Sequence, residues 1–255
     1  MRRRARAAVA VLLAASLGGR AAAYLPPGTA ILKRVAQRRD DLALASMQVQ
    51  GTLALAGEAA ARAAAAGVVA GAESVVPAFL LVKTPGRCRL ELAPAGVATS
   101  ERPAVTLRAS RVAGHHGLEG VPAAVALVEA VCALLAERGG GSEPEHGLAQ
   151  ALVGRGVALG DVTLGRLSGR VAWIIGGRPQ DGHPQAWVDK QSFQPVRLIA
   201  DFGAGVQDVR LLDFGSPIGG DGFPRAVEVW SGAQLQARFT TERLTPNPKL
   251  PDAVF

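Results

Sequence analysis

The sequence predicts an α+β protein, with a curled antiparallel β half-barrel of about ten strands, an N-terminal helix and a mid-chain helical plug or lid. Short segments that alternate apolar and polar residues are separated by Gly- and Pro-containing turns, most regularly after residue 156. A sheet that large must curl, close or split. Residues 121–138 are apolar on nearly every side, so a helix there needs cover all round, which a curled sheet supplies.

The first 23 residues have the pattern of a secretory signal peptide. Arginines within residues 2–6 precede an apolar run at residues 7–17, and alanines at residues 21–23 place small side chains before a cleavage point ahead of Tyr24. The alternative is a short membrane anchor, although a span needs about 20 apolar residues. We expect cleavage of residues 1–23, a single domain at residues 24–255, and a periplasmic protein that is soluble after cleavage.

The basic character of the chain belongs mostly to this leader. The chain has 28 Lys and Arg against 21 Asp and Glu, and the leader is rich in arginine but contains no acidic residue. The remainder is close to neutral and lacks the basic surface that non-specific nucleic-acid binding needs. We therefore expect no nucleic-acid partner.

The first element after the leader is expected to be a helix over residues 31–46, with Thr29 as its N-cap and an apolar stripe along one side. Residues 47–55 alternate strictly and predict a strand with one buried face. Residues 57–77 are rich in alanine and glycine and fit either a short helix or a poorly specified strand. Further strands are expected at residues 79–83, 86–92, 104–108 and 111–114.

The second half of the chain continues the pattern. The apolar helix at residues 121–138 stops at three glycines, and another helix is expected at residues 145–153. Neither a second domain boundary nor a solenoid repeat is visible. The strands expected to follow cover residues 157–167, 170–176, 185–189, 196–201, 206–214, 225–230 and 234–242.

The sequence contains none of the common catalytic or phosphate-binding motifs, such as G-x-S-x-G, H-E-x-x-H, C-x-x-C or the P-loop. The adjacent His115 and His116 would face opposite sides of a strand, so we interpret them as a solvated turn rather than a metal site. Glu143, Glu145 and His146 are interpreted as a capped helix start, with a weak surface metal site as the alternative. We expect no enzymatic activity, no metal and no cofactor.

Cys88 and Cys132 are the two cysteines of the chain. An even number in an exported protein is compatible with one disulfide, and the alternative is two small buried side chains that never meet. A catalytic thiol is not expected, because no histidine stands at a recognisable spacing from either cysteine.

Large apolar residues exceed what a one-sided core needs. Trp173, Ile174 and Ile175 are consecutive, so at least one points away from any single face. The alternative to a ligand site is a sheet that is covered on both faces. A surplus of apolar lining marks an apolar ligand site, and burial of ~15 methylenes gains on the order of 12 kcal/mol before ordering costs. The candidate lining and lid residues are Leu53, Leu81, Leu90, Leu127, Leu134, Trp173, Ile175, Trp187, Leu198, Leu211, Val229 and Phe239.

The order of several motifs resembles the periplasmic outer-membrane lipoprotein carrier or sorting family (LolA/LolB-like). The helix at residues 31–46 runs into the strand at residues 47–55, and FLLVKTPGR at residues 79–87 is similar to the family's W-V-K-x-P strand. The tail PDAVF at residues 251–255 is similar to the family's D-x-x-F ending. The other motifs that carry the resemblance are AWIIG at residues 172–176, AWVDK at residues 186–190 and QPVR at residues 194–197.

The resemblance implies a half-barrel whose dry cavity receives acyl chains of lipoproteins or other lipids for transfer toward the outer membrane. The implied partners are an inner-membrane lipoprotein-releasing transporter and an outer-membrane receptor. In the typical carrier, an arginine directly before the proline latches the lid; Thr84 stands there in this chain, so that latch is not carried over. The alternative function is a non-enzymatic sensing or binding module that recognises lipid or a membrane partner, and a third is a hydrolase with an unrecognised site.

Overall fold

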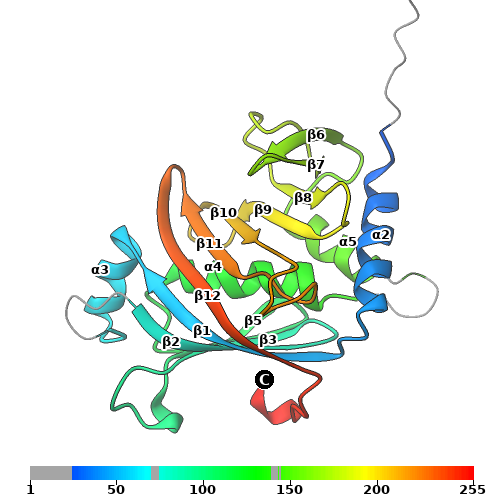
Figure 1. Ribbon diagram of the computed structural model, residues 1–255. Coiled ribbons are helices and arrows are strands. Elements are labelled where there is room, and N and C mark those ends of the chain that lie inside the picture. Colours follow the sequence, from blue (N-terminus) through cyan, green and yellow to red (C-terminus); the bar gives the residue numbers. More distant parts are fainter. Residues whose placement is uncertain (1–24, 70–74, 139–142, 144) are drawn as a thin grey trace, which may run out of the picture.

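The computed structural model describes residues 25–69, 75–138, 143 and 145–255. In this part of the chain, one antiparallel sheet of twelve strands packs against four α-helices (Figure 1). The signal peptide expected at residues 1–23 lies outside the described residues. No helix among the described residues is both long enough and apolar enough to span a membrane.

The helices begin and end at residues that partly differ from the expected ones. They are α2 (Gly28–Asp41), α3 (Gly57–Ala65), α4 (Pro122–Val131) and α5 (His146–Val153), with a π-helical turn η2 (Cys132–Ala136) directly after α4 and 3-10 turns η1 (Thr99–Glu101) and η3 (Asp252–Val254). The expectation that Thr29 caps α2 is wrong, because the helix already starts at Gly28 and has no side-chain cap. A Cβ at Gly28 would lie 2.4 Å from the Leu159 carbonyl oxygen, so close backbone approach places this helix start.

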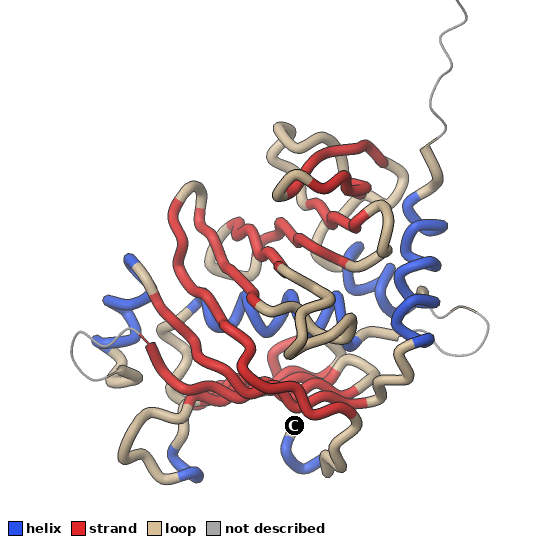
Figure 2. The backbone as a smooth tube through the Cα atoms, viewed as in Figure 1, coloured by secondary structure: helices blue, strands red, loops and turns tan. Residues whose placement is uncertain are grey.

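The strands form two meanders that meet in the middle of the sheet, where β1 pairs with β12 (Figure 2). The order across the sheet is β5-β4-β3-β2-β1-β12-β11-β10-β9-β8-β7-β6. We call β1–β5 and β6–β12 the two wings. The strands are β1 (Ser46–Leu55), β2 (Val75–Lys83), β3 (Arg87–Leu92), β4 (Ala104–Arg108), β5 (Arg111–His116), β6 (Val162–Leu167), β7 (Arg170–Ile175), β8 (Gln185–Asp189), β9 (Pro195–Asp201), β10 (Val206–Leu212), β11 (Ala226–Ser231) and β12 (Gln234–Pro246).

The α+β class, the antiparallel sheet and the N-terminal helix are confirmed. The sheet has twelve strands rather than about ten, and it is not closed or strongly curled, so the expected half-barrel is not what the structure shows. Its outermost strands, β5 and β6, each pair on one side only. The sequence of residues 57–77 fits either a short helix or a strand, and their described parts form α3 and the beginning of β2.

One apolar core fills the space between the helices and one face of the sheet, which we call the covered face. Val35 of α2, Ala63 of α3, Leu127 of α4 and Leu152 of α5 are fully buried in this core. α4 contacts β3 and β4 in one wing and β10, β11 and β12 in the other, so both wings pack on the same helix. A smaller apolar cluster around Ile174 lies on the opposite face, which we call the open face.

Candidate functional site

The helix α4 and the turn η2 form a plug (residues 122–136) that occupies the covered face. Every residue from Ala123 to Ala136 except Val125 is at least nine-tenths buried, as the all-round apolar sequence predicts. The plug ends in a π-helical turn, in which the Glu137 amide donates to the Cys132 carbonyl at 3.2 Å. The expected single helix over residues 121–138 is therefore shorter and changes its winding at Cys132.

Most of the expected ligand-lining residues belong to the core under or within the plug. Leu81 and Trp187 do not: Leu81 alternates with buried Leu80 and Val82 and faces away from the core, and Trp187 belongs to the cluster on the open face. These two candidates therefore do not share a face of the sheet with the others. The residues that do lie in the core are Leu53, Leu90, Leu127, Leu134, Trp173, Ile175, Leu198, Leu211, Val229 and Phe239.

The apolar hollow that we expected on the covered face is filled by the plug. A cavity at the margin of the plug, bordered by Met47 and Leu135, measures about 20 Å³, which is enough for one water molecule. A ligand larger than water therefore fits on the covered face only when the plug moves away from it.

Glu129 is the one charged residue of the plug, and it pairs with Arg155, which follows α5. The distance from Arg155 Nη1 to Glu129 Oε2 is 3.5 Å, and the two side chains are 13% and 12% exposed. Arg155 Nη2 also donates to the Ser110 carbonyl at 3.2 Å, and the guanidinium lies 5.2 Å from the centroid of the Phe202 ring. Burial raises the pKa of Glu129, while the charge of Arg155 acts in the opposite direction. Arg155 thus ties the plug to its surroundings.

The C-terminal end of the plug is held by Arg39 of α2. Arg39 Nη1 donates to the carbonyl oxygen of Leu134 at 2.9 Å and to that of Glu137 at 3.3 Å. Burial lowers the pKa of Arg39 to about 9, so the guanidinium is still charged at neutral pH. These bonds satisfy carbonyl groups that a helix end leaves without a partner.

Cys88 of β3 and Cys132 at the start of η2 lie next to each other in the core. Both thiols are free and fully buried. Burial, together with the hydrogen bond between the Cys88 and Cys132 thiols, raises the pKa of Cys88 well above its ordinary value. The disulfide stays a prediction, and the pair joins the plug to the sheet at the point where α4 becomes η2.

A cavity of about 340 Å³, which we call the turn cavity, lies between the β4–β5 turn and α5. Among the described residues, Ser110 Oγ and Arg155 Nε are buried without a hydrogen-bond partner. Ala109 and Ser110 both have left-handed backbone conformations, with φ of 50° and 53°, in a tight turn where Asn-Gly is the preferred pair. The cavity is lined by Ala109, Ser110, Arg111, Glu137, Gly147, Gln150, Ala151, Gly154 and Arg155.

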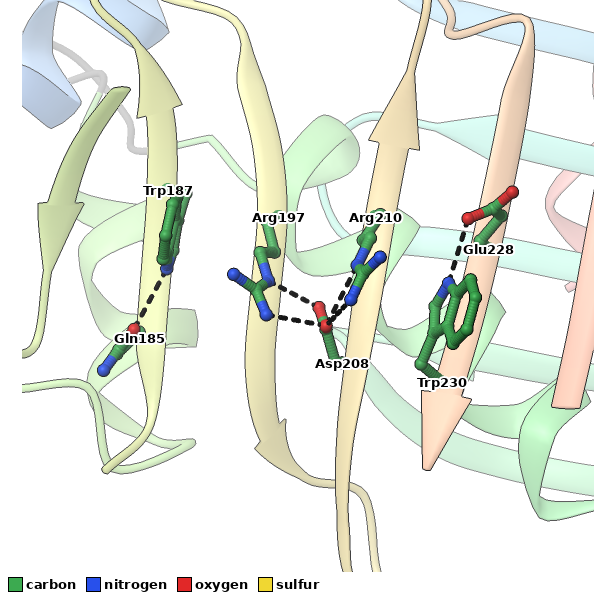
Figure 3. A network of polar contacts seen from close by, with 7 residues as sticks. All are labelled: Gln185, Trp187, Arg197, Asp208, Arg210, Glu228 and Trp230. Carbon is green, nitrogen blue, oxygen red and sulfur yellow. Dashed lines mark hydrogen bonds and ion pairs between the residues drawn. The ribbon is translucent and has the colours of Figure 1, made fainter. Parts of the chain in front are cut away.

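The open face of β8–β11 carries a ladder of stacked tryptophan and arginine side chains (Figure 3). The Arg197 guanidinium lies 4.6 Å from the Trp187 ring centroid, and Arg210 lies 4.7 Å from that of Trp230. Both arginines bind Asp208 between them, with nitrogen–oxygen distances of 2.7 Å. The ladder covers the tryptophans where no helix does. Sequence reasoning missed it, although the outward positions of β9 and β10 carry these charges.

A cavity of about 230 Å³, which we call the open-face cavity, lies beside this ladder. Its apolar lining includes Ala172, Val196 and Leu212, and its rim includes the ion pair between Arg170 Nε and Asp189 Oδ2 at 2.9 Å. Sequence reasoning placed no site here. These residues come together through the pairing of β7, β8, β9 and β10 and through the loop after β10. No local sequence pattern predicts a cavity that such distant segments form.

The part of the chain that the structure describes holds no group of three His, Cys, Asp or Glu side chains that could bind a metal ion. His115 and His116 are exposed at the end of β5. Glu143 lies 3.7 Å from His146, and Glu145 precedes α5 without a side-chain cap. The interpretation of these three residues as a capped helix start is therefore wrong.

No family model matches the sequence, and no curated protein matches it either. Solved structures of similar fold include a LolA superfamily protein from Nitrosomonas europaea, which is 15% identical with a TM-score of 0.46 over 91% of this chain and 98% of that one. A putative outer membrane lipoprotein-sorting protein domain from Vibrio parahaemolyticus is 10% identical with a TM-score of 0.38, over 86% and 93% of the two chains. MucB in the MucA/MucB complex of Pseudomonas aeruginosa is 13% identical with a TM-score of 0.31, over 89% and 59%.

Proposed function

We propose that the protein is a non-enzymatic periplasmic carrier that binds acyl chains of lipoproteins, or other lipids, on the covered face of the sheet and moves them toward the outer membrane. The plug is the observation that carries this proposal. It is apolar on every side and occupies a broad apolar surface shared by both wings. A surface of that kind suits an acyl chain once the plug leaves it.

Exchange of the plug for a lipid is energetically reasonable. Apolar burial is non-directional and depends on the area removed from water, so a flexible chain can replace a helix without matching its shape. An acyl chain of ~15 methylenes gains on the order of 12 kcal/mol on burial, which offsets much of the cost of exposing the plug. Few charged contacts oppose the movement of the plug. They are the ion pair between Glu129 and Arg155 and the hydrogen bonds that Arg39 donates to carbonyl oxygens at the end of the plug.

The test is binding of a fluorescent C16 fatty acid to delipidated protein, with hydrogen exchange measured at residues 122–136. We expect saturable binding, a higher melting temperature with lipid, and faster amide exchange in the plug when lipid is bound. Absence of binding together with an unchanged melting temperature would overturn the carrier proposal. Binding with undiminished protection of the plug would place the lipid elsewhere.

A second candidate is a non-enzymatic binding module that recognises lipid or a membrane partner without carrying cargo. The open-face cavity favours it, because that cavity is already present while the covered face is filled. A photoactivatable fatty acid distinguishes the two sites by the peptides that it labels. Labelling of Leu90 or Phe239, which lie in the sheet under the plug, supports the carrier, and labelling of Val196 or Leu212 supports the open-face module.

A further inference from the structure

The plug has the chemical make-up of an anionic amphiphile. Its fifteen residues are apolar except for one carboxylate, that of Glu129. This carboxylate lies against the guanidinium of Arg155, in a region where both side chains are nearly nine-tenths buried. A buried arginine whose partner leaves must find another anion, because an unpaired buried charge is costly. When the plug leaves, a negatively charged group that binds Arg155 therefore stabilises the open protein.

The turn cavity provides room for such a group next to Arg155. Its volume is about 340 Å³, and Arg155 and Ser110 both line it. Ser110 is 8% exposed, and its Oγ lacks a hydrogen-bond partner among the described residues, as does Arg155 Nε. Two buried donors without acceptors are uncommon in native proteins and match the oxygen atoms of a carboxylate or a phosphate.

The charges around the cavity are mixed. Arg111 lines the cavity and adds a positive charge, and Gln150 adds an amide that can donate. Glu137 also lines the cavity and opposes an anion. An anionic head group is therefore expected to bind by charge-assisted hydrogen bonds to Arg155 and Ser110, which must outweigh the repulsion from Glu137.

We propose that the ligand is an anionic amphiphile, whose carboxylate or phosphate head group replaces Glu129 on Arg155 and enters the turn cavity while its chain replaces the plug. This inference rests on the proposed carrier function and adds the class of head group. In this arrangement the plug is an internal competitor of the ligand, and Glu129 imitates the head group.

The test is displacement of a neutral fluorescent probe, the methyl ester of a labelled C16 fatty acid, from the delipidated full chain. Palmitate, hexadecyl phosphate and hexadecanol share one chain length and differ in the head group. We expect palmitate and hexadecyl phosphate to displace the probe at about tenfold lower concentration than hexadecanol, as one charge-assisted contact predicts.

Variants separate recognition of the head group from a structural role of the ion pair. Arg155→Gln should abolish the preference for anionic compounds without lowering the affinity for hexadecanol. Arg155→Lys should retain part of the preference for anionic compounds. Glu129→Gln should increase the affinity for palmitate more than that for hexadecanol, because it removes the internal competitor. Arg238→Gln is the matched control, since it breaks an ion pair with buried Glu228 on the open face and should leave the preference unchanged.

The outcomes are distinguishable. Equal displacement by all three compounds in the wild type and in the variants would overturn the head-group site and leave the carrier function standing. No binding of the probe or of any competitor would overturn the carrier function itself. If Arg155→Gln fails to fold, as circular dichroism would reveal, Arg155→Lys and Glu129→Gln still decide the matter, because they change one partner conservatively.

Discussion

Asp189 organises the turn between β8 and β9 through its buried carboxylate. Its Oδ1 accepts hydrogen bonds from the Gln191 amide at 3.0 Å and the Ser192 amide at 2.8 Å, and its Oδ2 pairs with Arg170. Burial acts to raise the pKa of Asp189, but the hydrogen bonds from Ser192 and Gln191 outweigh it and lower the pKa below its ordinary value of 3.8. The charged form is therefore the one that the fold stabilises.

We predict that Asp189→Ala lowers the free energy of unfolding by about 2 kcal/mol at pH 7, because four donors (the Gln191 amide, the Ser192 amide and hydroxyl, and Arg170) lose a charged acceptor. Since the pKa of Asp189 is lowered by folding, its contribution is present above pH 3.8 and is lost as the pH falls through the lowered pKa. The difference between variant and wild type should thus shrink in acid. Urea unfolding at pH 7 and pH 3 measures it, with exposed Asp41→Ala as the control; a pH-independent difference would contradict the prediction.

Glu129 shows the opposite dependence, because burial raises its pKa above the ordinary value of 4.5. The folded state then binds more protons than the unfolded state, so this residue's contribution to stability is fully present below pH 4.5 and is lost as the pH rises through the raised pKa. We predict that the unfolding free energy of Glu129→Gln, relative to the wild type, increases between pH 4.5 and pH 7. Glu58→Gln, at an exposed ion pair with Arg62, should show no such trend in the same titration.

Two of the candidate lining residues, Trp173 and Trp187, lie on opposite faces of the sheet. Trp173 pairs with Val188 across β7 and β8, so the next residue, Trp187, faces the opposite side of the sheet from Trp173. Alternation predicts that neighbours point to opposite faces, but it does not say which face the helices cover. The pairing register and the helix positions decide this, and both depend on contacts between distant segments.

At the scale of elements, the cysteine pair allows a direct test of whether the plug moves. Cys88 belongs to β3 and Cys132 to η2, so a disulfide between them fixes the plug to the sheet. A small-molecule disulfide such as oxidised glutathione supplies the oxidising equivalents: the two thiols form one S–S bond, and two glutathione thiols are released. Closing this loop stabilises a protein by roughly 2–4 kcal/mol.

We predict that the oxidised protein unfolds at higher denaturant concentration and no longer binds the C16 probe, and that dithiothreitol reverses both effects. Cys132→Ala removes the bond and serves as the control, whose binding should not respond to the oxidant. If the oxidised and the reduced protein bind the probe equally well, ligand binding does not require the plug to move away from β3.

Elements with strong local patterns could be predicted well, and those set by context could not. The strand β1 and the apolar plug have the positions that their periodicity indicates. The expected strand over residues 157–167 shortens to β6 at Val162–Leu167, and β12 extends to Pro246 beyond the expected residue 242. β12 continues because it pairs along the whole of β1, a partner that is distant in the sequence. Strand ends of this kind follow the partner rather than the local residues.

At the scale of the whole molecule, the pairing of β1 with β12 joins the first and last parts of the chain into one sheet. The two wings share one core, which contains Leu90 of β3 as well as Leu198 of β9. The antiparallel hairpins within each wing follow from short turns in the sequence. The pairing of β1 with β12 is a non-local contact that local patterns do not encode. The two wings should therefore unfold as one cooperative unit.

Gly51 lies at this junction and allows the whole-molecule prediction to be tested. A Cβ at Gly51 would lie 2.1 Å from the Thr240 carbonyl oxygen and 2.9 Å from Phe239 Cζ, at a bulge in the β1–β12 pairing. We predict that Gly51→Ala lowers the free energy of unfolding by about 3 kcal/mol, since the clash is with backbone and must separate the strands. Gly114→Ala is the matched control, because Gly114 is in edge strand β5 with no atom within 4 Å of its Cβ position. Denaturant unfolding followed by circular dichroism and by tryptophan fluorescence should give one shared transition for each variant. Separate transitions would mean that the wings unfold independently, and equal stabilities of the two variants would mean that the junction tolerates a displaced strand.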